Sequence, residues 1–528
     1  MEDKNKPLNN IVKGGLLLTA SAFIAKLLSA MYKVPFQNLT GDEGFYVYQQ
    51  IYPIYGLAAT FSLTGLPAFV SKVVSEAPDD ESLNHKMQEL NTWFSVIGLS
   101  LFLSLQFGAG MLASAMGDPN LAMVIRSIST FFLFMPVLAL IRGYFQGQSN
   151  MLPTSSSQVI EQIVRVLILL GTALLYIQNT WSVYDMGAWA YQSAWISALS
   201  GSLVLIYYLK RNHQLLNYLQ SLKPRWSWMM GRRLLSEGLL LVAVSSIMNI
   251  LQFIDSFTVF NGLVTAGYSN EMAMTLKGIY DRGQPLIQLG LVVGMGFSMT
   301  SLPILRKWSM ANNWDEWTEN AASVIKITLI LSSAASIGLA AVMPWMNHTL
   351  FTDQAGTETL QMLALSIFLG SLIYAVHMVL QSTNHAGNSS LLILLAGLGF
   401  KAITNQLAVR TMGIIGSSIV TFLSLSIICL LMVQMIPRAV WAKVFQNKFI
   451  VKIIGLLAGM YGVVWGAITF LQQITSISGR TGSLFLTLFG VGMGVLFFVG
   501  GAIWFNLLDE NELEQLPLSK TFQKLKRK

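Results

Sequence analysis

Residues Gly278–Gly290 read GIYDRGQPLIQLG and place Asp281 beside Arg282 inside an otherwise apolar run that continues to Pro303. Apolar runs of about 20 residues are long enough to cross a bilayer as a helix. A charge within such a run is costly, and membrane helices keep one mainly where it faces a wet cavity or a partner. The stretch therefore predicts a membrane helix with a functional charge pair.

The composition of the whole chain agrees with this interpretation. Its 528 residues are 53% hydrophobic and only 11% charged, whereas soluble proteins carry about 25% charged residues. The mean hydropathy is +0.57. A single cysteine, Cys429, excludes an internal disulfide framework and a cysteine metal cluster. A soluble protein could not bury this much apolar sequence in its core, so these values indicate a polytopic membrane protein.

Fourteen apolar segments are long enough to span the membrane, and their length predicts helices, since barrel strands need only about ten residues and alternate in polarity. We therefore predict an all-α fold of fourteen transmembrane helices. The predicted spans are 11–34, 44–74, 90–115, 121–146, 155–177, 187–209, 236–263, 272–304, 319–346, 358–381, 388–409, 412–436, 450–472 and 482–507.

Basic residues are unevenly distributed among the loops. The formal net charge is +8, but its clustering indicates a topology signal rather than binding to nucleic acid. By the positive-inside rule, the loops rich in Lys and Arg place both termini in the cytoplasm. The N-terminal lysines before GGLLLTASA also resemble a signal peptide, but the apolar run reaches Val34, which favours a retained first span. The expected location is the bacterial cytoplasmic membrane. The basic loop segments are residues 210–211, 223–233, 306–307, 438–448 and 524–528.

The two halves of the chain resemble each other. GLLLTASAFIAKLL at Gly15–Leu28 matches GLLLVAVSSIMNIL at Gly238–Leu251, and FSLTGLP at Phe61–Pro67 matches FSMTSLP at Phe297–Pro303. A weaker match pairs FQGQSN from Phe145 with LQSTNH from Leu380. Six spans is an even number, so the repeats are parallel, as in transporters that bind substrate between two lobes.

The repeat suggests a division into domains. Residues 1–220 would form an N-terminal lobe of six helices, and 221–437 a C-terminal lobe of six helices that begins with the basic linker. Residues 438–507 would add two helices, and 508–528 a cytoplasmic tail.

Charged residues inside the predicted spans are the candidate functional residues. A surplus of deep basic groups suits an anionic ligand, and the arginine fork matches phosphate oxygens. A lipid-linked phosphate or pyrophosphate would fit, and so would small organic anions. The candidate phosphate-binding residues are Arg282, Lys26, Arg142 and Arg165, and the supporting acidic residues are Asp281, Glu43 and Glu161.

Structural explanations compete with these roles. Glu161 and Arg165 are four residues apart and could pair on one helix face, and Arg142 could extend towards the cytoplasmic interface. Asp255 is an intramembrane carboxylate and a candidate coupling site, or it could form an ion pair with Lys401, which has Asn405 one turn further on. Neighbouring helix positions lie about 100° apart, so Asp281 and Arg282 cannot share one orientation, and Asp281 is predicted to orient or balance Arg282.

Catalysis has little support in the sequence. The chain contains no GxxxxGK[ST] phosphate loop, no HExxH motif and no Cys/His ligand cluster. We therefore expect a transporter, not an enzyme, with no cofactor and no metal site. Expected partners are a lipid-linked anionic substrate, membrane lipids and possible cell-wall synthesis enzymes, with the protein acting as a monomer.

Two motifs then identify a resemblance. RGYFQGQSNMLPTSSSQVIEQIVRV at Arg142–Val166 and IYDRGQPLIQLG at Ile279–Gly290 resemble the polysaccharide-synthase branch of the multidrug/oligosaccharidyl-lipid/polysaccharide flippase superfamily. Within that branch the chain resembles the stage V sporulation protein B type, which is related to the lipid II flippases. The resemblance implies a V-shaped, two-lobed fold that flips undecaprenyl-pyrophosphate-linked sugars outward across the cytoplasmic membrane by alternating access.

The resemblance also implies roles for individual residues. Asp281–Arg282 matches the Asp-Arg pair that gives lipid II flippases a cavity arginine, and Glu43 matches their acidic residue before the aromatic run of span two. Lys26 stands where they carry an arginine, and a further span-two arginine is absent near Tyr55. Asp255 corresponds to a sodium-site carboxylate of some members, with Lys401 where a neutral ligand would be expected.

Two other functions are compatible with the sequence. An ion-coupled multidrug or metabolite efflux antiporter on the same fold would use Asp255 as its ion site and would not need a basic cavity. A non-transporting scaffold for cell-wall synthesis would leave the cavity charges dispensable.

Overall fold

The computed structural model describes residues 27–238, 246–383, 388–475 and 478–509, together with Ile24, Val242 and Glu512. Helices and short connections make up these residues, and no strand occurs among them. The predicted span 11–34 lies outside the described residues except at its C-terminal end. The all-helical class predicted from the sequence is confirmed.

The described residues pack into two compact units. The first contains those up to Asp281 together with Asn405–Arg410, and the second contains Arg282–Thr404 and those from Thr411 onward. Helices of the first unit are α2 (Lys33–Thr60), η1 (Phe61–Gly65), α3 (Leu66–Ser75), α4 (Asp80–Ala115), η2 (Pro119–Leu121), α5 (Ala122–Ser129), η3 (Thr130–Leu133), α6 (Met135–Gly147), α7 (Leu152–Gln178), α8 (Val183–Arg211), α9 (Leu215–Ser221), α10 (Trp228–Arg233), η4 (Leu234–Gly238), α12 (Ile247–Thr265) and α13 (Asn270–Asp281).

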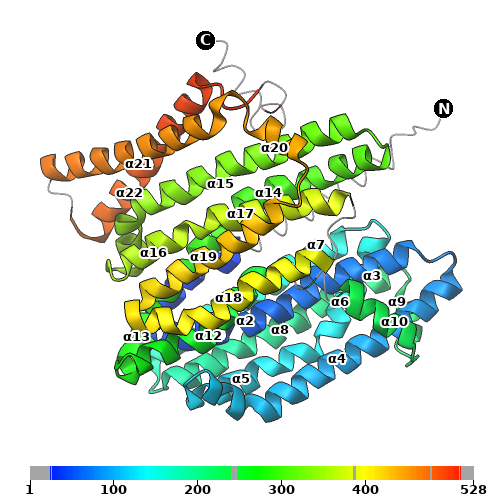
Figure 1. Ribbon diagram of the computed structural model, residues 1–528. Coiled ribbons are helices and arrows are strands. Elements are labelled where there is room, and N and C mark those ends of the chain that lie inside the picture. Colours follow the sequence, from blue (N-terminus) through cyan, green and yellow to red (C-terminus); the bar gives the residue numbers. More distant parts are fainter. Residues whose placement is uncertain are drawn as a thin grey trace. The chain divides into compact units, whose positions relative to one another are not determined.

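The second unit begins one residue after α13. Its helices are α14 (Gly283–Met310), α15 (Trp314–Phe351), α16 (Thr357–Ala364), α17 (Ser366–Ser382), α18 (Asn388–Met412, apart from the six residues that belong to the first unit), α19 (Ile414–Val433), α20 (Arg438–Val444), η5 (Gln446–Lys448), α21 (Phe449–Ile474) and α22 (Gly479–Trp504). Within this unit, α14, α15 and α17 lie side by side (Figure 1).

Eleven helical segments of the described chain are long and apolar enough to cross a membrane. Each overlaps a predicted span; α7, for example, covers the predicted 155–177, and α21 covers 450–472. The predicted spans 187–209 and 272–304 coincide with α8 and with α13–α14, which are not among the eleven. The number fourteen therefore stays a prediction.

Corresponding helices of the two units pack alike. In the first unit α3 packs against α6, and in the second α14 packs against α17. These are the second and fourth predicted spans of each half, so the same pair of helices forms a main contact in both. The packing agrees with the internal repeat and with the two-lobed architecture.

The segment from α2 to α3 departs from α-helical geometry at two places. Gly41 has φ +71° and ψ 179° within α2, a conformation in which glycine avoids the strain of a Cβ atom. A π-helical turn, η1, then joins α2 to α3. Such turns disturb the backbone hydrogen-bond ladder, and the Ser62 carbonyl of η1 accepts a hydrogen bond from Arg142 Nη1 at 3.1 Å.

The basic linker docks onto α4 in the first unit. The Trp93 indole N–H donates to the Ser227 carbonyl at 2.9 Å, and its ring centre lies 4.4 Å from that of Trp226. Arg225 N–H donates to Thr92 Oγ1 at 2.9 Å. The linker, α12 and α13 thus all pack with the first unit, while the predicted domain boundary at residue 220 stays a prediction.

The α3–α6 contact yields a test of the packing. A Cβ atom at Gly143 would lie 2.3 Å from Val70 Cβ and 2.7 Å from the Pro67 carbonyl oxygen. We expect Gly143→Ala to cost about 1–3 kcal/mol of stability through overpacking, seen as a lower apparent Tm in detergent. Gly171→Ala is the matched control, because a Cβ there meets nothing within 4 Å. Equal Tm values for both variants would contradict this account of the contact.

Candidate functional site

Arg165 of α7 is the centre of a buried cluster in the first unit. Its side chain is 1% exposed, Nη2 donates to Tyr48 Oη at 2.8 Å, and Cζ lies 3.2 Å from the centre of the Tyr55 ring. Nε and Nη1 are buried and find no hydrogen-bond partner among the described residues. Stacking on an aromatic face stabilises a cation, but two donors of this guanidinium have no acceptor among the described residues.

Lys33 supplies a second buried cation to the same cluster. Its Nζ lies 3.6 Å from the centre of the Tyr52 ring and has no hydrogen-bond partner among the described residues. Arg165 Cζ lies 5.9 Å from that ring, so one tyrosine faces both cations. We call Arg165, Lys33, Tyr48, Tyr52 and Tyr55 the cation–tyrosine cluster. Lys33 was not among the residues selected from the sequence, although it lies inside the predicted span 11–34.

No carboxylate of the described residues lies in direct contact with the two cations of the cluster. Among the described residues, no Asp or Glu forms an ion pair with Arg165 or Lys33 within 4 Å. Burying a charge without an opposite charge costs several kcal/mol. An anionic ligand would supply the missing charge and accept the free N–H groups, which is the chemistry expected of a phosphate-binding site.

Arg142 of α6 is satisfied by protein groups. Its Nη2 lies 2.6 Å from Glu161 Oε2, its Nε donates to Ser157 Oγ at 3.0 Å, and its side chain is fully buried. The expected extension of Arg142 towards the interface is therefore wrong. The expected pairing of Glu161 with Arg165 is replaced by this contact between α6 and α7, because Arg142 reaches the carboxylate from the neighbouring helix. Both residues have the surroundings of a structural ion pair.

Asp281 has a partner on its own helix. Both of its carboxylate oxygens accept hydrogen bonds from Lys277 Nζ at 2.6 Å, and both side chains are buried. The spacing of four residues places them on one face of α13. Lys277 was not among the residues selected from the sequence, although the same spacing rule would have found it.

Arg282 follows Asp281 but belongs to the second unit. Its Nη1 and Nη2 donate to Asp353 Oδ1 and Oδ2 at 2.6 and 3.0 Å, a two-pronged contact, and its Cζ lies 5.3 Å from the Phe351 ring centre. Partial burial acts to raise the pKa of Asp353, but the hydrogen bonds from Arg282 and the Ala355 N–H lower it below its usual value. Asp353 therefore stays ionised at neutral pH and holds the guanidinium.

The deep carboxylate Asp255 accepts hydrogen bonds from two neighbours. Tyr280 Oη donates to Oδ2 at 3.0 Å, and Asn405 Nδ2 donates to Oδ1 at 3.0 Å and also lies 2.6 Å from Thr258 Oγ1. Asn405 thus joins Asp255 in the first unit. In the second unit Lys401 Nζ donates to Thr421 Oγ1 at 2.8 Å, and the predicted Asp255–Lys401 pair stays a prediction.

For two further candidates, Glu43 and Lys26, the structure gives no contact that indicates a role. Glu43 is exposed on α2, and Lys26 lies outside the described residues. Over the part of the chain that the structure describes, no group of three or more His, Cys, Asp or Glu side chains could hold a metal ion. The roles of Glu43 and Lys26 stay proposals.

The fold itself is that of known membrane transporters. It matches a lipid II flippase MurJ in an inward closed conformation with a TM-score of 0.69 at 14% identity, covering 93% of this chain and 99% of that one. It also matches a multidrug resistance MATE family transporter in an inward-facing conformation with a TM-score of 0.63 at 15% identity, covering 80% and 96%. At such low identity these matches define the class of fold.

Sequence relatives identify the family. The model of the polysaccharide biosynthesis protein family matches residues 11–309, more than half of the chain, and the chain belongs to this family and to its superfamily of flippases. An uncharacterised membrane protein, YabM of Bacillus subtilis, is 32% identical over 98% of this chain and 97% of its own length. The lipid II flippase MurJ of the same organism is 27% identical over 67% of each chain, and its stage V sporulation protein B is 22% identical over 84% and 87%.

Proposed function

We propose that this protein flips an undecaprenyl-pyrophosphate-linked oligosaccharide or peptidoglycan precursor across the cytoplasmic membrane by alternating access. The observation that carries the proposal is the buried positive charge of the cation–tyrosine cluster, in which Arg165 Nε and Nη1 and Lys33 Nζ have no hydrogen-bond partner among the described residues. Membership of a flippase family supports it. So does similarity to a relative that acts on lipid II.

The chemistry of the cluster favours a pyrophosphate over a cationic drug. A guanidinium binds phosphate oxygens through parallel N–H groups, and an ammonium contributes a compact charge. Two cations that face one tyrosine ring can neutralise two phosphate groups, whereas a cationic drug would be repelled by both. An efflux antiporter would therefore gain nothing from this cluster.

Other charges would then have separate roles. Arg282, held by Asp353 in the second unit, would be a further phosphate ligand that exchanges its carboxylate for substrate. Lys26 would add a further positive charge, and Asp255 with Asn405 would form the coupling site. Arg142 and Glu161 would support the helices around the cluster. With both termini in the cytoplasm, transport would run outward.

Reconstitution into liposomes tests this function directly. We expect fluorescent undecaprenyl-pyrophosphate saccharides to cross the bilayer in vesicles with the protein, and not in empty vesicles or in vesicles with an Arg282→Ala variant expressed at the same level. The same saccharide on a single phosphate should cross more slowly, because one charge fewer is neutralised. Movement of cationic dyes down an opposing ion gradient, without movement of the lipid, would refute the proposal in favour of the antiporter.

A further inference from the structure

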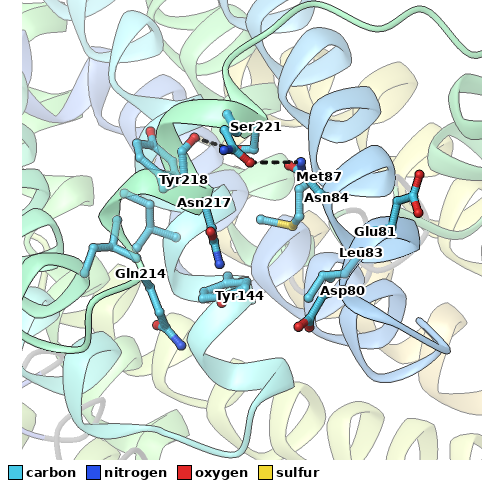
Figure 2. Close-up of a pocket in the computed structure, with 13 residues that line it drawn as sticks. Asp80, Glu81, Leu83, Asn84, Met87, Tyr144, Gln214, Asn217, Tyr218 and Ser221 are labelled. Atoms are coloured by element: carbon cyan, nitrogen blue, oxygen red, sulfur yellow. Dashed lines mark hydrogen bonds between the residues drawn. The ribbon is translucent and has the colours of Figure 1, made fainter.

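A pocket of about 330 Å³ lies in the first unit, and none of the charged candidates described above lines it. It is bordered by the first turns of α4, by α6, by the end of α8 and by the segment that forms α9 (Figure 2). Its volume is at the lower end of the range typical of small-molecule sites, about 300–1,000 Å³. The lining residues are Asp80, Glu81, Leu83, Asn84, Met87, Ile141, Tyr144, Leu209, Gln214, Asn217, Tyr218, Gln220 and Ser221.

Two amide oxygens in the lining lack donors. Asn84 Nδ2 donates to Gln220 Oε1 at 3.5 Å and Gln214 Nε2 donates to Gln148 Oε1 at 3.1 Å, so both amide nitrogens are used. Asn84 Oδ1 and Gln214 Oε1 are buried and have no partner among the described residues. A buried acceptor without a donor costs about 1–3 kcal/mol, so a ligand with hydrogen-bond donors would stabilise this lining.

The lining also offers donors. The Asn217 side chain points towards Tyr144 in the middle of the pocket, whereas the Glu81 carboxylate points away from it (Figure 2). Burial raises the pKa of Tyr218 to about 12, so its phenol keeps its proton at physiological pH. Amide and phenol groups that both donate and accept match hydroxyl groups, each of which also does both.

Other ligand classes fit less well. No Lys or Arg is among the lining residues, so an anion would meet Asp80 and two free acceptors without a compensating charge. An ammonium has only donors and would leave the amide and phenol hydrogens of the lining unpaired. The apolar side chains of Leu83, Met87 and Ile141, together with the Tyr144 ring, suit the C–H surface of a ring that carries hydroxyls at its edge.

We propose that this pocket, which we call the amide pocket, binds one hydroxyl-rich, uncharged sugar ring. The inference rests on the proposed function, since the ring would be part of the head group of the lipid-linked cargo. The basic loops place α9 on the cytoplasmic side, where such a head group is built. The amide pocket would select the glycan, while the cation–tyrosine cluster binds the pyrophosphate.

Saturation-transfer NMR on the full chain in nanodiscs tests the site without requiring transport. The probes are free glucose, galactose, N-acetylglucosamine and the disaccharide chitobiose, and sugar-free buffer is the blank. We expect at least one sugar to bind, and Asn84→Leu and Gln214→Leu each to weaken its binding about tenfold, as loss of hydrogen bonds in a buried site implies. Unchanged sugar affinity in both variants, or no binding to the wild type, would overturn the inference.

Matched variants separate this inference from the proposed function. Gln106→Leu is the control, since Gln106 lies on the same helix and also has a buried amide oxygen without a partner, but does not line the pocket. It should leave sugar binding unchanged. Arg165→Gln should lower the transport rate by about 100-fold and retain sugar binding, so failure of the sugar site leaves the flippase proposal standing, and the reverse holds as well. An apparent Tm for each variant identifies any that misfold.

A second set of probes identifies the source of the sugar. Binding of the free sugar, of its nucleoside diphosphate conjugate and of its lipid-linked form can be compared on the same nanodiscs. We expect the lipid-linked form to bind tightest, because anchoring in the bilayer raises its effective concentration. Preference for the nucleotide sugar would contradict a head-group site.

Discussion

Replacing Arg165 by Gln is expected to lower the rate of lipid flipping by about 100-fold while leaving the protein at least as stable as the wild type. The loss follows from two charge-assisted hydrogen bonds to the ligand, each contributing about 1.5–3 kcal/mol. The gain in stability follows from removing a buried charge whose Nε and Nη1 have no partner among the described residues. Flipping in proteoliposomes and the apparent Tm measure the two effects.

Arg165→Lys sharpens this test. It keeps the positive charge and the stacking on Tyr55 but loses the fork of parallel donors, so we expect an intermediate rate, about tenfold below the wild type. Lys33→Met should reduce flipping without destabilising the protein, because it too removes a buried charge that has no hydrogen-bond partner among the described residues. A wild-type flipping rate in the Arg165→Gln protein would refute the assignment of the cation–tyrosine cluster as the phosphate-binding site.

Unlike Arg165→Gln, Arg142→Ala is expected to destabilise the protein, by about 3–5 kcal/mol, because it leaves the Glu161 carboxylate buried without its partner. The double variant Arg142→Met with Glu161→Leu should recover most of this loss, since it removes both charges and keeps the volume. Unfolding in mixed micelles measures these differences.

Transport by the double variant distinguishes the two roles considered for Arg142. If the residue is structural, as its three protein contacts indicate, the double variant should flip lipid at close to the wild-type rate. Normal stability of Arg142→Ala combined with complete loss of transport would instead restore the phosphate-binding role predicted from the sequence.

The fold could be predicted from the sequence because hydropathy and helix length are properties of single segments. The predicted 155–177 and 412–436 overlap α7 and α19 closely, since an apolar run ends where its helix leaves the membrane. Gly41 and the π-helical turn were not predicted, because both depend on how neighbouring helices meet.

The partners of the charged residues could be predicted only within a helix. Spacing would have joined Lys277 to Asp281, but the same rule gave Glu161 the wrong partner, because Arg142 lies on another helix 19 residues away. Likewise, Asp353 is 71 residues from Arg282 and stands in a loop. Packing between helices decides which of two cations a buried carboxylate pairs with.

The five-residue π turn at Phe61–Gly65 has a consequence for the length of this part of the chain. Before it, α2 directs Tyr48, Tyr52 and Tyr55 towards the buried cations; after it, α3 directs Val70 towards Gly143. One residue corresponds to about 100° of rotation on a helix. Deleting a single residue here would restore a regular helix yet turn one of these faces away from its partner. The turn therefore sets the rotation of α3 relative to α2. Relatives of this chain should tolerate substitutions here far better than insertions or deletions.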